Sequence, residues 1–285
     1  MSSMVIFNGN ILDENKVSIS INNRSFRYGD GCFETIKVVN ANILLAQYHF
    51  NRLFSSLETL QFVVPPDFNQ GFLAQLITNL IELNSHAALA RVRITFFRGD
   101  GGPYDNVDHH PNYIIQSWSG SGESLRFNEA GFVMDFFQDA RKTSDKFSHI
   151  KSNNYLPYSM GALYAKKNSL NDCLIFNSSN RIAESTIANV FIVIDGVIKT
   201  PALTEGCVSG VMRKYLLSRF KADNLPVLES EIHKGDLLAA SEVFLTNALY
   251  GIRWVSKVAH SNYSNHMSSL FYEKYIASLF SSRTF

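Results

Sequence analysis

Strand-like and helix-like segments alternate along the whole chain, and this alternation limits the possible folds more than any other feature of the sequence. A small, polar stretch, SWSGSGESL at residues 117–125, separates these segments into two unequal groups. We therefore expect an α+β protein of two domains. The predicted parts are a small N-terminal domain over residues 1–116, a linker over 117–126 and a larger C-terminal domain over 127–285.

The first group contains strand-like runs and two amphipathic helices. Its predicted strands are 3–12, 16–21, 32–45 with a turn at Asn40-Ala41-Asn42, and 90–97. Apolar residues recur every three or four positions over 50–60 and again over 72–83, which predicts two helices that each bury one face. Pro65 and Pro66 end the first of them.

The second group mixes shorter strands with three helices. Its predicted strand segments are 131–137, 173–186, 188–201 with a hairpin turn at Asp195-Gly196, and 241–255. The predicted helices are 154–168, 209–222 and 266–280, and the last of these reads as core-facing.

Charge and composition exclude several classes of protein. The 26 basic and 25 acidic residues of the 285 are scattered, which gives no sign of a nucleic-acid or membrane partner. The chain has no apolar run near the roughly 20 residues that cross a bilayer, and no signal-peptide pattern at its start, so we expect a cytoplasmic protein.

Metal binding is not expected. The three cysteines, Cys32, Cys173 and Cys207, lie far apart and lack the spacing of metal ligands. Four histidines are possible metal ligands, but no suitably arranged carboxylates accompany them: His49, His86, His109 and His110.

One lysine stands out by its surroundings. Lys151 follows a hydrophobic run and precedes a predicted helix, in the segment HIKSNNYLPYSM. Such a lysine is either a solvated loop residue or an amine that forms a Schiff base with a carbonyl cofactor. A pyridoxal phosphate site would also need a carboxylate for the pyridine nitrogen, a helix N-terminus for the phosphate and often an arginine.

Candidates for those further groups exist elsewhere in the chain. Glu184 lies at a strand end among small residues, and Arg52 lies on the first predicted helix. Ser209 and Gly210 precede another helix, which leaves the first amides of that helix free to face an anion. Each of these residues also has an ordinary structural explanation, so the residue types alone do not show whether the chain binds pyridoxal phosphate.

The order and wording of seven segments resemble the class IV aminotransferases, the fold-type IV pyridoxal phosphate enzymes. The segments are RSFRYGDGCFETIKV, HFNRLFSS, RVRITFFRGDGG, IKSNNYL, RIAESTIANVFIVIDGVIKTP, GVMR and EVFLTNAL. The family includes branched-chain and D-amino acid aminotransferases and 4-amino-4-deoxychorismate lyases. The resemblance implies a barrel-like sheet in the C-terminal domain, pyridoxal 5′-phosphate (PLP) as cofactor, a small amino substrate and a homodimer.

The resemblance also implies roles for individual residues. Lys151 matches the Schiff-base lysine, which would act as general base, and Glu184 matches the partner of the pyridine nitrogen. The remaining cofactor positions are Tyr155 near the phenolic oxygen, and Arg52, the amides of Val211 and Met212, and the turn at Asn247 and Ala248 for the phosphate. Met212 and Ala248 stand where relatives carry hydroxyl side chains, so backbone amides would hold the phosphate here.

The specific reaction is harder to predict. The chain has Phe33 and the loop GDGGPYDN where D-amino acid aminotransferases carry their carboxylate-binding residues, which disfavours that activity. Four motifs resemble those of 4-amino-4-deoxychorismate lyases and so favour that enzyme and folate biosynthesis: GDGCFET, SGVMR, TNAL and RGDGG. The motif KSNNYL, in contrast, resembles that of branched-chain aminotransferases. The lyase is our specific prediction, with a transaminase as the alternative and a non-catalytic PLP-binding homologue as a remote one.

Three residues are predicted to contact substrate: Phe33, Tyr28 and Arg98. For Arg98, an ion pair at the end of its strand is an equal alternative. Phe33 and Tyr28 could instead pack within the small domain.

Overall fold

The computed structural model describes residues 3–281, which form two compact units. Unit 1 contains the described residues up to Glu123, Lys151–Asn154 and Ser281, and unit 2 contains Ser124–Ile150 and Tyr155–Phe280. The first boundary lies within the stretch 117–126 that its composition marks as a linker, although a strand extends to Ser119. Both units combine helices with a sheet, so the predicted α+β class is confirmed.

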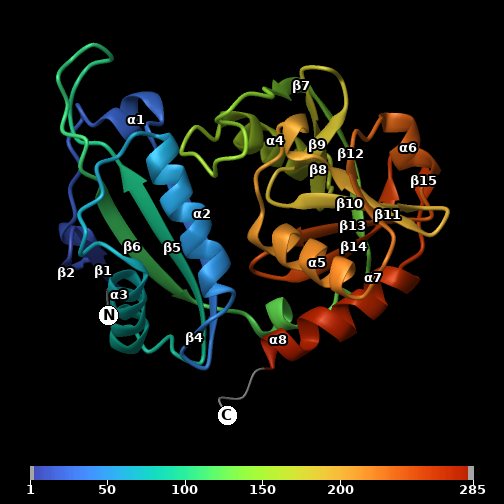
Figure 1. Ribbon diagram of the computed structural model, residues 1–285, viewed down its shortest axis with the longest axis horizontal. Coiled ribbons are helices and arrows are strands. Elements are labelled where there is room, and N and C mark those ends of the chain that lie inside the picture. Colours follow the sequence, from blue (N-terminus) through green and yellow to red (C-terminus); the bar gives the residue numbers. More distant parts are fainter. Residues whose placement is uncertain (1–2, 282–285) are drawn as a thin grey trace. The chain divides into compact units, whose positions relative to one another are not determined.

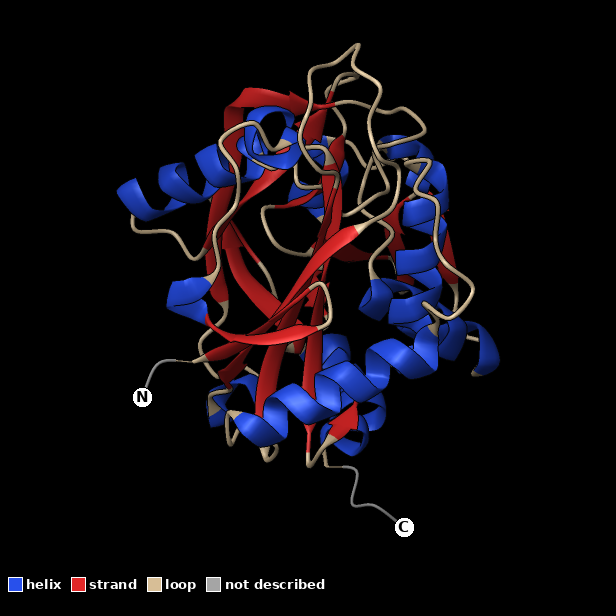
Figure 2. Cartoon of the chain, turned by 90° about the vertical axis from the view of Figure 1, so that its left-hand side faces the viewer, coloured by secondary structure: helices blue, strands red, loops and turns tan. Residues whose placement is uncertain are grey.

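Unit 1 is built on a six-stranded sheet in the order β2-β1-β6-β5-β3-β4 (Figures 1 and 2). Its strands are β1 (Met4–Phe7), β2 (Asn10–Asp13), β3 (Gly31–Val39), β4 (Asn42–Ile43), β5 (Leu89–Phe97) and β6 (Asn112–Ser119). Every neighbouring pair is antiparallel. Asn40 and Ala41 both have positive φ, which produces the tight turn predicted between β3 and β4.

Alternation along β5 explains how this sheet is covered. Ala90, Val92, Ile94 and Phe96 are buried on one face, while the residues between them are more exposed. The helix α2 (Ala46–Thr59) packs on β3, and α3 (Gln70–Leu83) packs on β1 and β6. Both helices were predicted from their periodicity. A short helix, α1 (Arg24–Tyr28), precedes β3.

Unit 2 contains a nine-stranded mixed sheet in the order β12-β11-β10-β13-β14-β7-β8-β9, with β15 paired to β14. Its strands are β7 (Phe132–Lys142), β8 (Asp172–Asn177), β9 (Ile182–Ser185), β10 (Asn189–Ile194), β11 (Val197–Pro201), β12 (Val227–Ser230), β13 (Glu242–Asn247), β14 (Gly251–Val258) and β15 (Ser261–Asn262). Strand β9 also contacts β10 and β11, because the sheet curls back on itself. This is the barrel-like sheet that the family resemblance implies.

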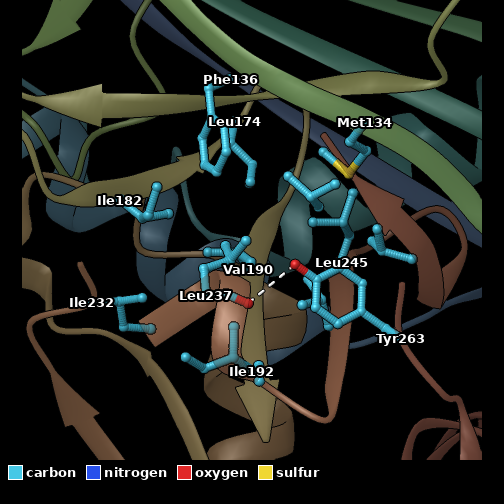
Figure 3. Close-up of a cluster of buried hydrophobic side chains, with 14 of the residues drawn as sticks. Met134, Phe136, Leu174, Ile182, Val190, Ile192, Ile232, Leu237, Leu245 and Tyr263 are labelled. Atoms are coloured by element: carbon cyan, nitrogen blue, oxygen red, sulfur yellow. Dashed lines mark hydrogen bonds between the residues drawn. The ribbon is translucent and has the colours of Figure 1, made fainter. Parts of the chain in front are cut away.

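The inside of the curled sheet holds the core of unit 2. Met134, Phe136, Leu174, Val190 and Leu245 are buried there with side chains from other strands (Figure 3). The hydroxyl of Tyr263, which is drawn among them, donates a hydrogen bond to the carbonyl of Leu237 at 3.1 Å. The core thus satisfies this hydroxyl with a backbone acceptor.

The helices of unit 2 follow the three predicted segments, except for the short α6, which was not predicted. They are α4 (Leu156–Lys167), α5 (Val211–Ala222), the short α6 (Lys234–Ala239) and a C-terminal run of α7 (His266–Phe271), the π-helix η4 (Tyr272–Ala277) and α8 (Ser278–Phe280). Tyr272, Tyr275 and Ile276 are buried, so the final run faces the core as expected. None of the helices in the described residues is long and apolar enough to span a membrane.

The predicted strand over residues 16–21 is wrong. Glu14–Lys16 forms a 3-10 helix, η1, and the residues that follow adopt no regular structure. Ile19 and Ile21 are 48% and 79% exposed, so their alternation does not reflect burial against a core. Short 3-10 turns, η2 (Gly122–Leu125) and η3 (Leu203–Glu205), occur where no element was predicted.

Candidate active site

Lys151 is held in unit 1 by the start of β3. Its carbonyl oxygen accepts a hydrogen bond from the amide of Phe33 at 2.9 Å, and the amide of Asn153 donates to the carbonyl of Gly31 at 2.9 Å. Gly31 is required, because a Cβ there would lie 2.1 Å from the carbonyl oxygen of Phe96. The short segment 151–154 is therefore fixed like an extra strand at the edge of β3, and the lysine is half-buried.

The ring of Phe33 lies next to the Lys151 amine. Lys151 Nζ lies 4.6 Å from the ring centroid, and the guanidinium carbon of Arg93 lies 3.7 Å from the same centroid. Phe33 is buried, so it fixes the two cations in one region of unit 1. Sequence reasoning missed Arg93. No local signal marked it, because its contact with Phe33 arises from the β3–β5 pairing, in which Arg93 lies opposite Thr35 and Phe33 opposite Thr95.

Arg52 lies on α2 and forms a two-pronged ion pair. Its Nε and Nη2 donate to the two carboxylate oxygens of Glu34, each at 2.7 Å. His49, one turn earlier on the helix, places Nδ1 2.7 Å from Glu34 Oε2. Because a carboxylate only accepts, the imidazole carries its proton on Nδ1.

Electrostatics explain why these three groups can be buried together. Burial by itself raises the pKa of the Glu34 carboxyl, but the charge of Arg52 and the contact with His49 outweigh it, and the pKa is lowered to about 2. Burial lowers the pKa of His49, and the Arg52 and Lys151 cations lower it further, against the opposing effect of Glu34. Glu34 is thus an anion and His49 is neutral near pH 7.

Glu184 lies on β9 in unit 2 and is 3% exposed. Its Oε1 accepts hydrogen bonds from Lys142 Nζ at 2.5 Å and from the Tyr158 hydroxyl at 2.7 Å. Its Oε2 accepts from the amide of Val208 at 3.0 Å and faces Asn189 Nδ2 at 3.4 Å. A carboxylate fixed in this way can accept a hydrogen bond from a protonated pyridine nitrogen. Lys142 was missed because its partner is 42 residues away in the sequence.

Tyr155 begins the part of unit 2 that follows the lysine segment. Its hydroxyl donates to the carbonyl of Thr186 at 2.9 Å, two residues after Glu184. Its ring stacks on Tyr158 with centroids 4.4 Å apart, and Tyr158 in turn contacts Glu184. Unit 2 therefore brings Tyr155 and Glu184 together through one intervening ring.

The first turn of α5 is the candidate phosphate site. Val211 and Met212 are its first two residues, and their amides have no acceptor within the helix. Gly210 precedes them, and a Cβ there would lie 1.8 Å from Asn189 Oδ1. The same Asn189 faces Glu184, so this helix start and the carboxylate lie close together.

The turn after β13 supplies the remaining predicted cofactor residues. The Asn247 side chain accepts hydrogen bonds from the amides of Leu249 and Tyr250 at 2.9 and 3.1 Å, and donates to the carbonyl of Ile187 at 3.2 Å. Asn247 therefore shapes the turn that carries Ala248. If either residue contacts a phosphate, it would do so through its backbone amide.

The other two predicted substrate residues lie in unit 1. Arg98 is buried and binds the carboxylate of Asp30 at 3.1 Å and the carbonyl of Leu60, so it forms the strand-end ion pair that was the alternative to a substrate contact. Tyr28 is 41% exposed, with the guanidinium groups of Arg24 and Arg27 5.7 and 5.1 Å from its ring centroid.

These residues fit PLP chemically. A buried carboxylate that is hydrogen-bonded to a lysine suits a pyridinium, and a glycine-preceded helix start suits a phosphate. Lys151 supplies a half-buried amine. When bound, PLP supplies an aldehyde that reacts with amines and a ring that accepts electrons. Within residues 3–281, by contrast, no group of three or more His, Cys, Asp or Glu side chains could hold a metal ion.

Comparison with known proteins identifies the family. The family model for amino-transferase class IV matches residues 31–258. An aminodeoxychorismate lyase from Vibrio harveyi is 28% identical over 85% of this chain and 88% of its own length, and one from Bacillus subtilis is 27% identical over 92% and 89%. A branched-chain aminotransferase structure from Thermoproteus uzoniensis superimposes with a TM-score of 0.87 at 21% identity, over 98% of this chain and 95% of that one, and shows the same fold. The chain belongs to the class IV aminotransferase family and is a PLP-dependent enzyme, either a lyase or a transaminase.

Proposed function

We propose that this protein is a 4-amino-4-deoxychorismate lyase, which releases pyruvate and leaves para-aminobenzoate for folate biosynthesis. The observation that carries the proposal is that two relatives matched over most of both chains are aminodeoxychorismate lyases. The wordings GDGCFET and SGVMR at the candidate site support the same reaction.

The proposed roles follow from the surroundings of each residue. Lys151 would hold the cofactor through its amine, and the same amine would remove the α-proton of the substrate. Glu184 would hold the ring nitrogen through its buried carboxylate, which is fixed by hydrogen bonds from unit 2. The amides of Val211 and Met212 bind the phosphate together with Arg52, whose guanidinium is held by Glu34.

Arg93 is the residue we propose for a substrate carboxylate. Both products of the lyase reaction carry a carboxylate, so the substrate has two of them. A guanidinium binds a carboxylate through two parallel hydrogen bonds. Arg93 and the Lys151 amine lie on one phenylalanine ring, which supports a carboxylate held near the reacting amine.

Product analysis tests the proposed reaction. Purified protein loaded with PLP is offered 4-amino-4-deoxychorismate, and separately branched-chain and D-amino acids with 2-oxoglutarate. The proposal predicts para-aminobenzoate and pyruvate in equal amounts from the first, with no glutamate formed from the others. Rapid glutamate formation from branched-chain amino acids, with no para-aminobenzoate, would establish the transaminase instead.

The proposal includes a cytoplasmic homodimer, as the family resemblance implies. Size-exclusion chromatography with light scattering tests the assembly, since a dimer has twice the mass of the 32.1 kDa chain.

A further inference from the structure

Lys142 is the last residue of β7 and lies next to the candidate site in unit 2. The β7–β8 pairing shifts register between Phe137 and Arg141, just before this lysine. Such an irregularity changes the direction of the side chains that follow it. Beyond it the register resumes, with Lys142 opposite Asn177 and its carbonyl accepting the amide of Ser178 at 3.0 Å. The backbone of Lys142 is thus fixed from the neighbouring strand.

Its side chain is fixed as well. The ammonium lies 2.5 Å from Glu184 Oε1 and 5.3 Å from the centroid of the Tyr158 ring. Lys142 is 11% exposed and Glu184 is 3% exposed, so solvent screens this ion pair weakly. A surface lysine would be free to leave its partner, whereas this one is packed against an aromatic ring.

The other groups that contact Glu184 carry no charge. Among the described residues its further partners are the Tyr158 hydroxyl, the Val208 amide and the Asn189 side chain. Burial, and then the charge of Glu184, raise the pKa of Tyr158 well above its usual value, so this phenol stays neutral. The nearby Cys207 thiol is also neutral, since burial raises its pKa to about 12. Lys142 is therefore the partner that can balance the charge of Glu184.

We propose that Lys142 is a positioning residue that keeps the proton on the cofactor's ring nitrogen by stabilising the negative charge of Glu184. This inference rests on the proposed contact between Glu184 and that nitrogen. One proton is shared between the nitrogen and the carboxylate. A cation 2.5 Å from the carboxylate lowers the free energy of the arrangement in which the carboxylate is the anion.

The same geometry separates the roles of the two lysines. The aldehyde carbon and the ring nitrogen of PLP are at opposite ends of the ring. An amine bound to the carboxylate that holds the nitrogen is therefore at the wrong end to attack the aldehyde. Lys142 acts on charge, and Lys151 carries the covalent chemistry.

The test is a nitrogen-15 NMR spectrum of the protein loaded with PLP labelled at the ring nitrogen. Lys142→Gln removes the charge but keeps a donor, and Lys142→Arg keeps the charge. Tyr158→Phe is the matched control, because it removes an uncharged donor from the same oxygen of Glu184. If Lys142→Gln does not fold, Lys142→Met, which retains most of the apolar stem, takes its place.

We expect a protonated-nitrogen signal in the wild type, Lys142→Arg and Tyr158→Phe, and a shift toward the unprotonated signal in Lys142→Gln. We also expect the dissociation constant of PLP to rise about tenfold in Lys142→Gln alone. A wild-type signal in Lys142→Gln, even with lowered stability in urea, would show a purely structural lysine and overturn the inference. Failure of the proposed contact between Glu184 and the ring nitrogen looks different, since the wild type itself would then lack the protonated-nitrogen signal, and a transaminase in place of the lyase would leave all four spectra as expected.

Discussion

At the scale of single residues, two cationic side chains contact the ring of Phe33. Which of them binds the substrate is a question that substitutions can answer. Arg93 and Lys151 lie 3.7 and 4.6 Å from the ring centroid. Arg93 also donates from Nε to Thr95 Oγ1 at 3.1 Å, so its orientation is set by its own strand. A second arginine on β5, Arg91, contacts Trp118 instead and serves as a matched control.

Arg93→Met should weaken substrate binding more than it slows the chemistry. Loss of hydrogen bonds between charged groups is expected to raise KM roughly 10- to 100-fold, with a smaller change in kcat. Arg91→Met removes an equal charge from the same strand and should leave KM nearly unchanged. Steady-state kinetics with 4-amino-4-deoxychorismate measure both, and equal effects of the two variants would exclude a specific carboxylate site at Arg93.

Glu34 shows how a buried charge makes stability depend on pH. Its folded-state pKa of about 2 is below the ordinary value of 4.5, so ionised Glu34 stabilises the fold above pH 4.5. That contribution is lost as the pH falls from about 4.5 through about 2. Glu34→Gln should therefore lower the free energy of unfolding at pH 7 by on the order of 3 kcal/mol.

Urea unfolding of the apo-protein at several pH values checks this. The difference between wild type and Glu34→Gln should shrink as the pH is lowered, whereas exposed Glu82→Gln on α3 should show little difference throughout. A difference that does not change with pH would contradict the assigned role of the charge.

At the scale of elements, the start of α5 depends on one glycine. Gly210 has an ordinary φ of −64°, so space and not backbone conformation excludes a side chain there. The neighbouring Asn189 also bonds the carbonyl of Val208 at 2.8 Å, which ties the loop before the helix to β10. The direction of the free amides at Val211 and Met212 follows from this packing.

Gly210→Ala should displace the first turn of α5. We expect a loss of about 1–3 kcal/mol in stability and a weaker affinity for PLP. Gly235→Ala in α6 is the control, because its added Cβ meets nothing within 4 Å and alanine favours a helix by up to about 1 kcal/mol. Calorimetric titration of the apo-protein with PLP measures the affinity, and an unchanged affinity in Gly210→Ala would remove α5 from the proposed phosphate site.

At the scale of the whole molecule, the proposed cofactor residues are divided between the two units. Lys151 and Arg52 belong to unit 1, while Glu184 and the start of α5 belong to unit 2. The chain leaves unit 2 after Ile150 and returns to it at Tyr155. Lys151 in unit 1 and Tyr155 in unit 2 are therefore only four residues apart in the sequence. The segment 151–154 belongs by its contacts to unit 1, although it lies far along the sequence in the predicted C-terminal domain.

Addition of PLP should therefore slow hydrogen exchange in both units. The expected segments are the start of β3 with 151–154, and residues 208–212 before and within α5. Mass spectrometry of peptides after exchange measures this protection. Absence of protection in either set of segments would contradict the proposed cofactor role of the residues in that set.

How much the sequence could predict depended on the range of each interaction. The helices α2 and α3 followed from local periodicity, and the roles of Lys151 and Glu184 were proposed from segment order. The pairs Lys142–Glu184 and Arg93–Phe33 join residues far apart in sequence, and three lysines within ten positions (142, 146 and 151) are alike in composition. The alternation of Ile19 and Ile21 was misleading because period-two spacing does not show whether a partner strand exists.

Mapping of the reduced cofactor adduct tests the central claim most directly. The protein is incubated with PLP, reduced with borohydride, digested and analysed by mass spectrometry. We predict that the phosphopyridoxyl group is found on Lys151. Its presence on Lys142 instead, or on no lysine, would contradict the account of this site.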